Sequence, residues 1–128
     1  MKELTKAEEQ VMQVLWEIKR GFVKDVIDKL PEPKPAYNTV STIIRILEKK
    51  GFAGHEDFGK TYRYFPLVTK KDYSKQVMQG LVKNYFGNSY QTLFSFFAKN
   101  NKLSVSELEE MRNLVDNEIR KIKEDPNE

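Results

Sequence analysis

The sequence predicts a mainly α-helical fold with one small β-hairpin, and three observations lead to this expectation. Apolar residues recur at helical spacing over most of the 128 residues. One pair of short runs rich in aromatic residues flanks a glycine-containing turn, which is typical of a hairpin. Charged residues make up 32% of the chain and hydrophobic residues 39%, which indicates a globular rather than a disordered protein.

The composition also excludes several classes of function. The chain contains no cysteine, which excludes disulfides, thiolate metal sites and cysteine nucleophiles. His55 is the single histidine, and no glycine-rich loop follows a strand, so we expect neither an enzyme nor a metal or cofactor site. The N-terminal residues lack an apolar signal core, and no run reaches the roughly 18 apolar residues of a membrane span. We therefore expect a cytoplasmic protein without membrane insertion.

The first helix is predicted over roughly Lys6–Lys19. Thr5 and Glu8 stand at the spacing of a capping box, in which each side chain accepts a hydrogen bond from the backbone N–H of the other residue. The apolar residues that follow recur every three or four positions, as on one face of a helix. Gly21 is expected to end the helix, because glycine readily adopts the left-handed conformation that closes many helices.

Two further helices are expected before the hairpin. Apolar spacing predicts a short helix from about Val23 to Leu30, and prolines at 31, 33 and 35 then exclude helix through Ala36. Asn38 is the expected N-cap of the third helix, and Gly51 is expected to end it. The apolar stripe of this helix consists of Val40, Ile43, Ile44 and Leu47.

The hairpin is expected to pair residues 52–56 with residues 61–65 around a turn at residues 57–60. Beyond the hairpin, Thr69 is the predicted start of a fourth helix, which ends at Gly87-Asn88.

Two more helices complete the prediction. The fifth covers Ser89–Asn100 and is rich in large apolar groups. Ser104 and Glu107 form another capping box ahead of the sixth helix, whose apolar residues approach a heptad spacing. Residues 125–128 are expected to fray.

A domain boundary is expected at residues 67–69, where strand chemistry gives way to a capped helix. Residues 1–68 are predicted to form one domain and residues 69–128 a helical domain. Three helices followed by a hairpin are the order of a winged helix-turn-helix. The predicted fold is therefore mainly α with a small β-hairpin wing: a winged helix-turn-helix domain plus a C-terminal three-helix dimerisation domain.

The third helix has the division of faces that reading DNA requires. An α-helix fits the major groove, where exposed side chains reach base edges while the apolar side holds the helix on its domain. Arg45 is long enough for a bidentate contact with guanine or for a phosphate, and the pattern leaves both open. The candidate DNA-binding residues of this helix and the hairpin are Asn38, Thr39, Ser41, Thr42, Arg45, Lys49, Lys50, Lys60 and Arg63.

The distribution of charge also favours the third helix and the hairpin as the DNA-binding region. Residues 34–63 contain six Lys or Arg against three Asp or Glu, whereas residues 99–128 contain six against eight. The net charge of +3 is small, but the basic excess lies mid-chain, where it would attract phosphate in a salt-dependent way.

The last three predicted helices carry more apolar groups than about 60 residues can bury within one chain. This surplus favours a partner surface, and a homodimer is the expected partner. The candidate dimerisation residues are Val77, Leu81, Leu93, Phe94, Phe96, Phe97, Leu108, Met111, Val115 and Ile119. The alternative is that these groups pack back on the N-terminal domain.

Three segments resemble the penicillinase repressor family, which includes methicillin-resistance and copper-responsive repressors. They are residues 4–16 (LTKAEEQVMQVLW), residues 37–52 (YNTVSTIIRILEKKGF) and residues 62–68 (YRYFPLV). The start of the sixth helix, residues 103–114, is also similar. The likeness covers nearly the whole chain, and its most specific part is the third helix with the hairpin.

This resemblance implies a homodimeric transcriptional repressor on a dyad-symmetric operator in double-stranded DNA. It also implies a β-lactamase, resistance or related stress gene as target. In relatives of this kind, a membrane metalloprotease sensor system triggers cleavage within the dimerisation region, and the weakened dimer leaves the DNA.

Two departures from the family bear on the inducing signal. The relatives that are cleaved carry an Asn-Phe bond in the fifth helix, and the matching positions here are Phe96 and Phe97. These residues are the candidate cleavage site, although a protease that prefers asparagine is not expected to cut there. The copper-responsive branch has a cysteine cluster, and this chain has no cysteine.

Other interpretations of single features remain open at this level. A polar face opposite an apolar stripe is the default of any surface helix, and Lys60 and Arg63 also suit a solubilising role. Tyr62 is expected to pack rather than stack on bases, Trp16 to lie in the core or at a domain seam, and His55 to be a plain hairpin residue.

Two rival functions remain open as well. One is a winged-helix adaptor that binds protein instead of DNA. The other is a regulator with a small molecule among the fifth-helix aromatics.

Overall fold

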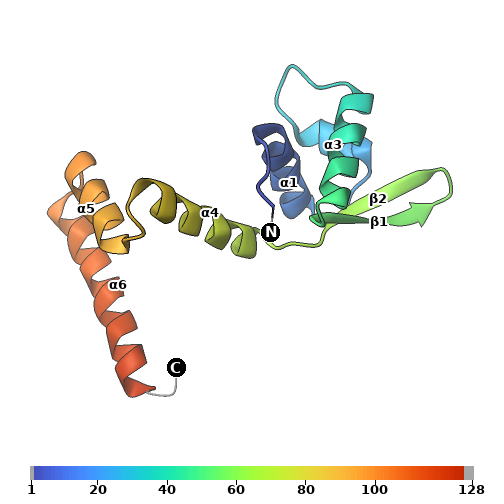
Figure 1. Ribbon diagram of the computed structural model, residues 1–128. Helices are drawn as coiled ribbons and strands as arrows, with labels where there is room; N and C mark the ends of the chain where they lie inside the picture. Colours follow the sequence, from blue (N-terminus) through green and yellow to red (C-terminus); the bar gives the residue numbers. More distant parts are fainter. Residues whose placement is uncertain (1, 126–128) are drawn as a thin grey trace. The chain divides into compact units, whose positions relative to one another are not determined.

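The computed structural model describes residues 2–125 and shows six helices and one two-stranded antiparallel sheet in this range (Figure 1). The elements are α1 (Lys6–Ile18), α2 (Val23–Lys29), α3 (Tyr37–Lys49), β1 (Ala53–Phe58), β2 (Thr61–Pro66), α4 (Lys70–Tyr85), α5 (Tyr90–Asn100) and α6 (Val105–Glu124). The predicted fold class is confirmed, since three helices precede the hairpin and three follow it. Of the residues expected to fray, 126–128 lie outside the described part of the chain. In the described part, no helix combines the length and the apolar character needed to cross a membrane.

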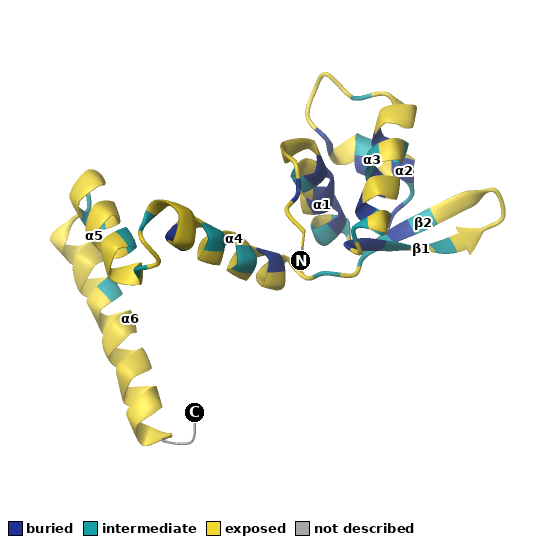
Figure 2. Cartoon of the chain, in the orientation of Figure 1, coloured by how far each residue is buried: buried dark blue, intermediate teal, exposed yellow. Residues whose placement is uncertain are grey.

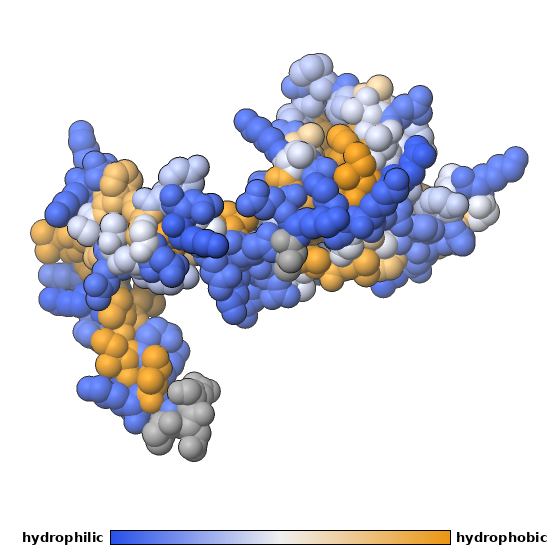
Figure 3. Space-filling view, viewed as in Figure 1, coloured by the Kyte–Doolittle hydropathy of each residue, from blue (hydrophilic) through white to orange (hydrophobic). Residues whose placement is uncertain are grey.

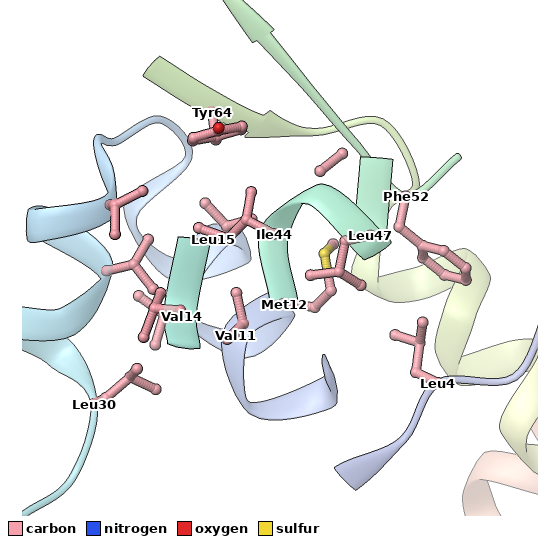
Figure 4. Packing of buried hydrophobic residues seen from close by; sticks show 14 of the residues in the cluster. Leu4, Val11, Met12, Val14, Leu15, Leu30, Ile44, Leu47, Phe52 and Tyr64 are labelled. Atoms are coloured by element: carbon pink, nitrogen blue, oxygen red, sulfur yellow. The ribbon is translucent and has the colours of Figure 1, made fainter. Parts of the chain in front are cut away.

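One apolar core organises the first compact unit, which extends to Gly80. Figure 4 shows how side chains of α1 and α3 interlock, with Phe52 and Tyr64 closing the core from the hairpin side. The largest fully buried side chains of this unit are Val11, Met12, Leu15, Val26, Val40, Ile44, Leu47 and Phe52. Close packing of three helices on the base of a hairpin holds the exposed face of α3 in a fixed position.

The start of α1 follows the prediction, and its end does not. The Thr5–Glu8 capping box is present, with Glu8 N–H donating to Thr5 Oγ1 at 3.2 Å and Thr5 N–H to Glu8 Oε1 at 2.9 Å. Gly21, however, is not the residue that ends the helix, because Lys19 takes the positive φ of 71°.

Gly21 serves a close approach instead. It pairs with Tyr64 of β2 through two backbone hydrogen bonds of 2.9 and 2.7 Å. A Cβ at this position would lie 2.5 Å from Ile18 Cδ1. Glycine therefore avoids a clash with the side chains of Ile18 and Asp25 at the point where the chain pairs with β2.

The start of α3 also corrects the prediction. Ala36 is the N-cap and Tyr37 the first helical residue, so Asn38 lies inside the first turn rather than at the cap. Proline restricts its own φ and the residue before it but leaves the following residue free to enter a helix. The helix therefore begins as soon as the chain leaves Pro35.

The hairpin is longer and its turn tighter than predicted. Ala53 pairs with Pro66 and Phe58 with Thr61, which leaves Gly59 and Lys60 as the turn. Gly59 has a φ of +69°, as hairpin turns of two residues require. The wing thus carries Lys60 at its tip.

α4 begins at the predicted place, but its first half belongs to the first unit. Thr69 Oγ1 accepts a hydrogen bond from Asp72 N–H at 3.0 Å. Tyr73 is buried, with its ring 5.6 Å from that of Phe52, and Trp16 Nε1 donates to Val68 O at 2.8 Å. These contacts anchor the segment after the hairpin, so the compact unit ends at Gly80, whereas the sequence predicts a boundary at residues 67–69.

The second unit begins at Leu81 and contains the rest of α4, α5 and α6. The break at Gly87 and Asn88, which take positive φ, and the Ser104 cap of α6 follow the predictions. Ser89, expected as the first residue of the fifth helix, is instead the N-cap of α5. Neither α5 nor α6 contains a buried residue, and both are almost wholly exposed in Figure 2. The second unit therefore lacks a core of the kind that the first unit has.

Candidate nucleic-acid interface

α3 separates its side chains into a buried face and an exposed face. Val40, Ile44 and Leu47 are 0% exposed, and Figure 4 shows Ile44 and Leu47 directed into the core. On the other side, the predicted DNA-binding residues are exposed, with Ser41 of intermediate exposure. They are Asn38, Thr39, Ser41, Thr42, Arg45 and Lys49. The exposed face thus carries short polar side chains near the N-terminus of α3 and cationic side chains toward its C-terminus.

Hydrogen bonds within α3 constrain two of these side chains. Thr42 Oγ1 donates to the backbone oxygen of Asn38 at 2.8 Å, so its hydroxyl proton is used inside the helix. Arg45 Nη2 donates to Ser41 Oγ at 3.2 Å, one turn earlier. This contact holds the guanidinium along the helix on the side of Ser41.

Ser41 and Arg45 line a hollow of about 520 Å³ between α3, the start of α2 and the wing. Lys60 and Tyr62 line it from the wing. The hollow therefore brings together three cations (Lys24, Arg45 and Lys60), the carboxylate of Asp25, hydroxyl groups and aromatic walls. Asn38, Thr39, Thr42 and Lys49 are not among its lining residues, so the predicted residues of α3 fall into a wing side and an outer side.

Lys50, a predicted DNA-binding residue, is engaged within the protein. Its Nζ lies 2.6 Å from Oε1 of Glu8 and donates to the backbone oxygen of Glu3 at 3.2 Å. The Glu8 side chain is 7% exposed and that of Lys50 is 22% exposed. Burial by itself raises the pKa of Glu8, but the hydrogen bond from Lys50 and those from Thr5 outweigh it and lower the pKa below its usual value. Lys50 therefore neutralises a buried carboxylate and ties α3 to α1.

Arg63 is engaged within the wing. Its Nη2 lies 3.2 Å from Glu56 Oε1 on the paired strand, and its guanidinium lies 4.8 Å from the centre of the Phe58 ring. Arg20 also contacts Glu56, at 2.9 Å. Because one carboxylate and one ring already hold Arg63, the free cation of the wing is Lys60, for which the described residues show no ion pair.

His55 links the wing to α3 and is more than a plain hairpin residue. Its Nδ1 lies 2.6 Å from Glu48 Oε2, its Nε2 lies 3.7 Å from Asp57 Oδ1, and its ring stacks on Tyr62 with centroids 4.2 Å apart. The hydrogen bond with Glu48 raises the pKa of His55 above its usual value, with the nearby carboxylates adding to the effect. The His55 ring thus bridges α3 and the wing.

Two exposed residues of α3 are absent from the sequence prediction. Tyr37 is 56% exposed and lines the hollow, and Ile46 is 38% exposed. The sequence spacing could have predicted the exposure of Ile46, since it stands seven residues after Thr39 and four after Thr42, on the same side of a helix. The apolar stripe at Val40, Ile44 and Leu47 is complete without it.

The candidate dimerisation residues lie on α4, α5 and α6 with much of their apolar surface exposed. Figure 3 shows apolar side chains along the region of α6. Exposed large groups from the prediction are Val77, Leu81, Phe94, Phe96, Phe97, Leu108, Val115 and Ile119, while Leu93 and Met111 are of intermediate exposure. Leu114 and Ile122 extend this surface at 66% and 56% exposed.

The second unit also has an apolar hollow of about 550 Å³, lined by Leu81, Tyr85, Phe86, Thr92 and Phe96. A small-molecule site among the fifth-helix aromatics would need convergent polar groups, and Thr92 is the one small polar side chain in this lining. In residues 2–125, no group of three or more His, Asp or Glu side chains is placed to hold a metal ion.

Comparison with known proteins agrees with this architecture. A family model described as "Penicillinase repressor" matches residues 4–117. Methicillin resistance regulatory protein MecI of Staphylococcus aureus (strain N315) is 27% identical over 114 residues, which cover 88% of this chain and 93% of that protein. The penicillinase repressor of Bacillus licheniformis is 24% identical over 123 residues, or 95% and 96% of the two chains. The penicillinase repressor of Staphylococcus aureus is 26% identical over 120 residues, or 93% and 94%.

Proposed function

The chain belongs to the penicillinase repressor family and is accordingly a transcriptional repressor rather than an enzyme, and we propose that it acts as a homodimer on a dyad-symmetric DNA operator. In this proposal, α3 of each subunit enters the major groove of one half-site. The wing contacts the flanking backbone, and the helices after Gly80 join the two subunits.

One observation carries the DNA-reading part of the proposal. Val40, Ile44 and Leu47 are completely buried and hold α3 on the core. The opposite side carries short polar groups and the cations Arg45 and Lys49, for which the described residues show no ion pair. Short side chains allow the helix backbone to come close to base edges. A rigid helix presented in this way suits a groove reader, because specificity depends on fixed placement of the reading groups.

The number of exposed cations determines the electrostatic contribution to DNA binding. Arg45, Lys49 and Lys60 are exposed, whereas Lys50 and Arg63 are held by carboxylates. Three cations in each of two subunits give about six phosphate contacts. The logarithm of the binding constant should then fall with the logarithm of salt concentration with a slope of about −5.

Dimerisation is the second part of the proposal. One winged domain neutralises few phosphates and binds weakly alone, whereas a second linked domain finds its half-site at a high effective concentration. α5 and α6 have no buried residue, so their apolar surface remains available to a second copy. Apolar surface of this extent on a soluble monomer typically marks an interface.

The names of the relatives support a proposal for the target, and the family resemblance supports one for the release. Because those proteins regulate methicillin resistance or penicillinase by their names, we propose that this repressor controls a β-lactamase, resistance or related stress gene in the cytoplasm. Release by cleavage in α5, under a membrane metalloprotease sensor, would separate the subunits. Phe96 is 55% exposed and Phe97 is 37% exposed, and mass spectrometry of the repressor from induced cells tests whether the chain is cut there.

A gel-shift titration with DNA from upstream of the protein's own gene tests the proposal. The full chain is titrated at two salt concentrations, with scrambled DNA as competitor. We expect specific binding with the steep salt slope given above, and Lys60→Ala should reduce the slope by about 2 in the dimer, one unit per subunit. Binding without a salt slope, or no preference over scrambled DNA, would favour a protein-interaction adaptor instead.

A further inference from the structure

We propose that Ile46 reads the 5-methyl group of a thymine in each operator half-site, together with the methyl group of Thr42. The inference rests on the proposed function, because it names one base that α3 recognises. It also assigns a specificity role to a residue outside the polar set that defines the exposed face.

The position of Ile46 is the first observation. It stands four residues after Thr42 and three before Lys49, which places all three on the outer side of α3. Ile46 is 38% exposed although it is apolar. Val40, Ile44 and Leu47 supply the buried side of α3. Ile46 belongs neither to the core cluster nor to the partly buried apolar residues packed against that cluster.

The second observation concerns Thr42, one turn before Ile46. Its hydroxyl donates to the backbone oxygen of Asn38 at 2.8 Å, so the proton is not available to a base. What Thr42 retains for a partner is its methyl group and an accepting lone pair. Two aliphatic groups thus adjoin on a face whose other members are polar or charged.

The third observation is the charge beside this apolar spot. Lys49 lies one turn after Ile46, and Arg45 precedes it and is tethered to Ser41 on the wing side. Cations on both sides attract the phosphate backbones that border a major groove. A spot of this kind is therefore brought against base edges, not against another protein's apolar surface.

The chemistry of the major groove then selects the base. Thymine alone presents an apolar group there, while cytosine and adenine present amino donors and guanine presents acceptors. An isoleucine pressed on a donor or acceptor removes water from it without replacing the hydrogen bond. Ile46 consequently favours thymine through its methyl group and disfavours the other bases through desolvation.

Replacement of single thymines by deoxyuridine tests the contact, because this change removes the methyl group and alters no hydrogen-bonding group. The full chain is titrated against a series of operator duplexes, each with one symmetric pair of thymines replaced. Burial of one methyl group corresponds to roughly a fourfold change in affinity per half-site. Because both half-sites are changed, we expect a loss of roughly sixteenfold at one symmetric pair of positions and little change at the others.

Variants of Ile46 assign the effect to this residue. Ile46→Ala should bind the thymine and deoxyuridine duplexes about equally, whereas Ile46→Val, which keeps a branched apolar group, should retain most of the difference. Leu67→Ala is the matched control, because Leu67 is an exposed apolar residue at 59% that lies outside α3, and it should behave as the unaltered protein does. Thermal unfolding followed by circular dichroism confirms that each variant is folded.

The outcomes separate this inference from the function on which it rests. Specific, salt-dependent binding that is indifferent to every thymine methyl group would overturn the Ile46 contact and leave the repressor proposal in place. A methyl effect that persists unchanged in Ile46→Ala would also overturn it. Failure of the unaltered chain to prefer any operator would refute the proposed function itself and the contact with it.

Discussion

Adjacent lysines at the end of α3 should have opposite roles, and replacing each by methionine separates them. Lys50 Nζ lies 2.6 Å from Glu8 Oε1 and is 22% exposed, whereas Lys49 is exposed and makes no ion pair within residues 2–125. Methionine keeps most of the aliphatic stem and removes the charge. Lys50→Met should therefore lower the free energy of unfolding and leave intrinsic DNA affinity nearly unchanged, and Lys49→Met should do the reverse.

The burial of Glu8 determines how much unfolding free energy the Lys50→Met variant should lose. Removing one partner of a fully buried ion pair destabilises a protein by about 3–5 kcal/mol. Here the Lys50 side chain is partly exposed, and Glu8 keeps its hydrogen bond from the Thr5 N–H at 2.9 Å, so we expect about 2 kcal/mol. For a unit of this size that loss lowers the melting temperature by roughly 8–16 °C. Lys49→Met should stay within about 0.5 kcal/mol of the unaltered protein.

The pH dependence gives a second check with a definite sign. Because the pKa of Glu8 is lowered in the folded protein, its carboxylate contributes stability above the unfolded pKa, and this contribution is lost as pH falls through the folded pKa. Without Lys50, burial disfavours the ionised form of Glu8, and protonation removes the cost of the buried, unpaired charge. The stability difference between Lys50→Met and the unaltered chain should therefore shrink on acidification through the carboxyl range.

Urea unfolding followed by circular dichroism, at fixed protein concentration, measures these differences. Equal stability of Lys50→Met and Lys49→Met would refute the assignment of Lys50 to the core. A larger loss of DNA affinity in Lys50→Met than in Lys49→Met, measured on folded protein, would return Lys50 to the interface.

Four further predictions concern other parts of the molecule. Arg45→Ala should weaken operator binding by about 1–3 kcal/mol; an equal loss on random DNA would mean that Arg45 holds phosphate only. Gly80→Ala should stabilise α4 by about 1 kcal/mol, because nothing lies within 4 Å of the added Cβ, and a lower melting temperature would contradict this. Phe96→Asp should convert the dimer to monomer in sedimentation experiments, and an unchanged mass would place the interface elsewhere. An NMR titration should show that the hydrogen bond with Glu48 raises the pKa of His55 above its usual value, and Glu48→Gln should abolish this upward shift. The contribution of His55 to stability is therefore complete below the unfolded pKa and is lost as pH rises through the folded pKa.

Features that depend on local chemistry could be predicted from the sequence. Capping by Thr5, Thr69 and Ser104 requires only a side chain and an amide three residues later, and all three contacts are present. The alternation of buried and exposed positions along α3 follows in the same way from its 3.6-residue period.

Features that depend on distant partners could not be predicted. Lys50 looks like any cation at a helix end, and its partner Glu8 precedes it by 42 residues. Gly21 looks like a helix stop, but its backbone pairs with that of Tyr64 on β2, 43 residues later. Arg63 is held by Glu56 across the hairpin, a pairing that depends on strand register. Burial of Tyr73 against Phe52 likewise extends the first unit beyond the end of the hairpin.

The spacing of the two half-sites tests the central claim most directly, namely that two copies of α3 engage one DNA duplex at a fixed separation. Affinity is measured for the operator, for the operator with one half-site scrambled, and for the operator with ~5 base pairs inserted at its centre, about half a helical turn. We predict tight binding to the first duplex alone, with the insertion as damaging as the loss of a half-site. Equal affinity for all three duplexes would contradict the account.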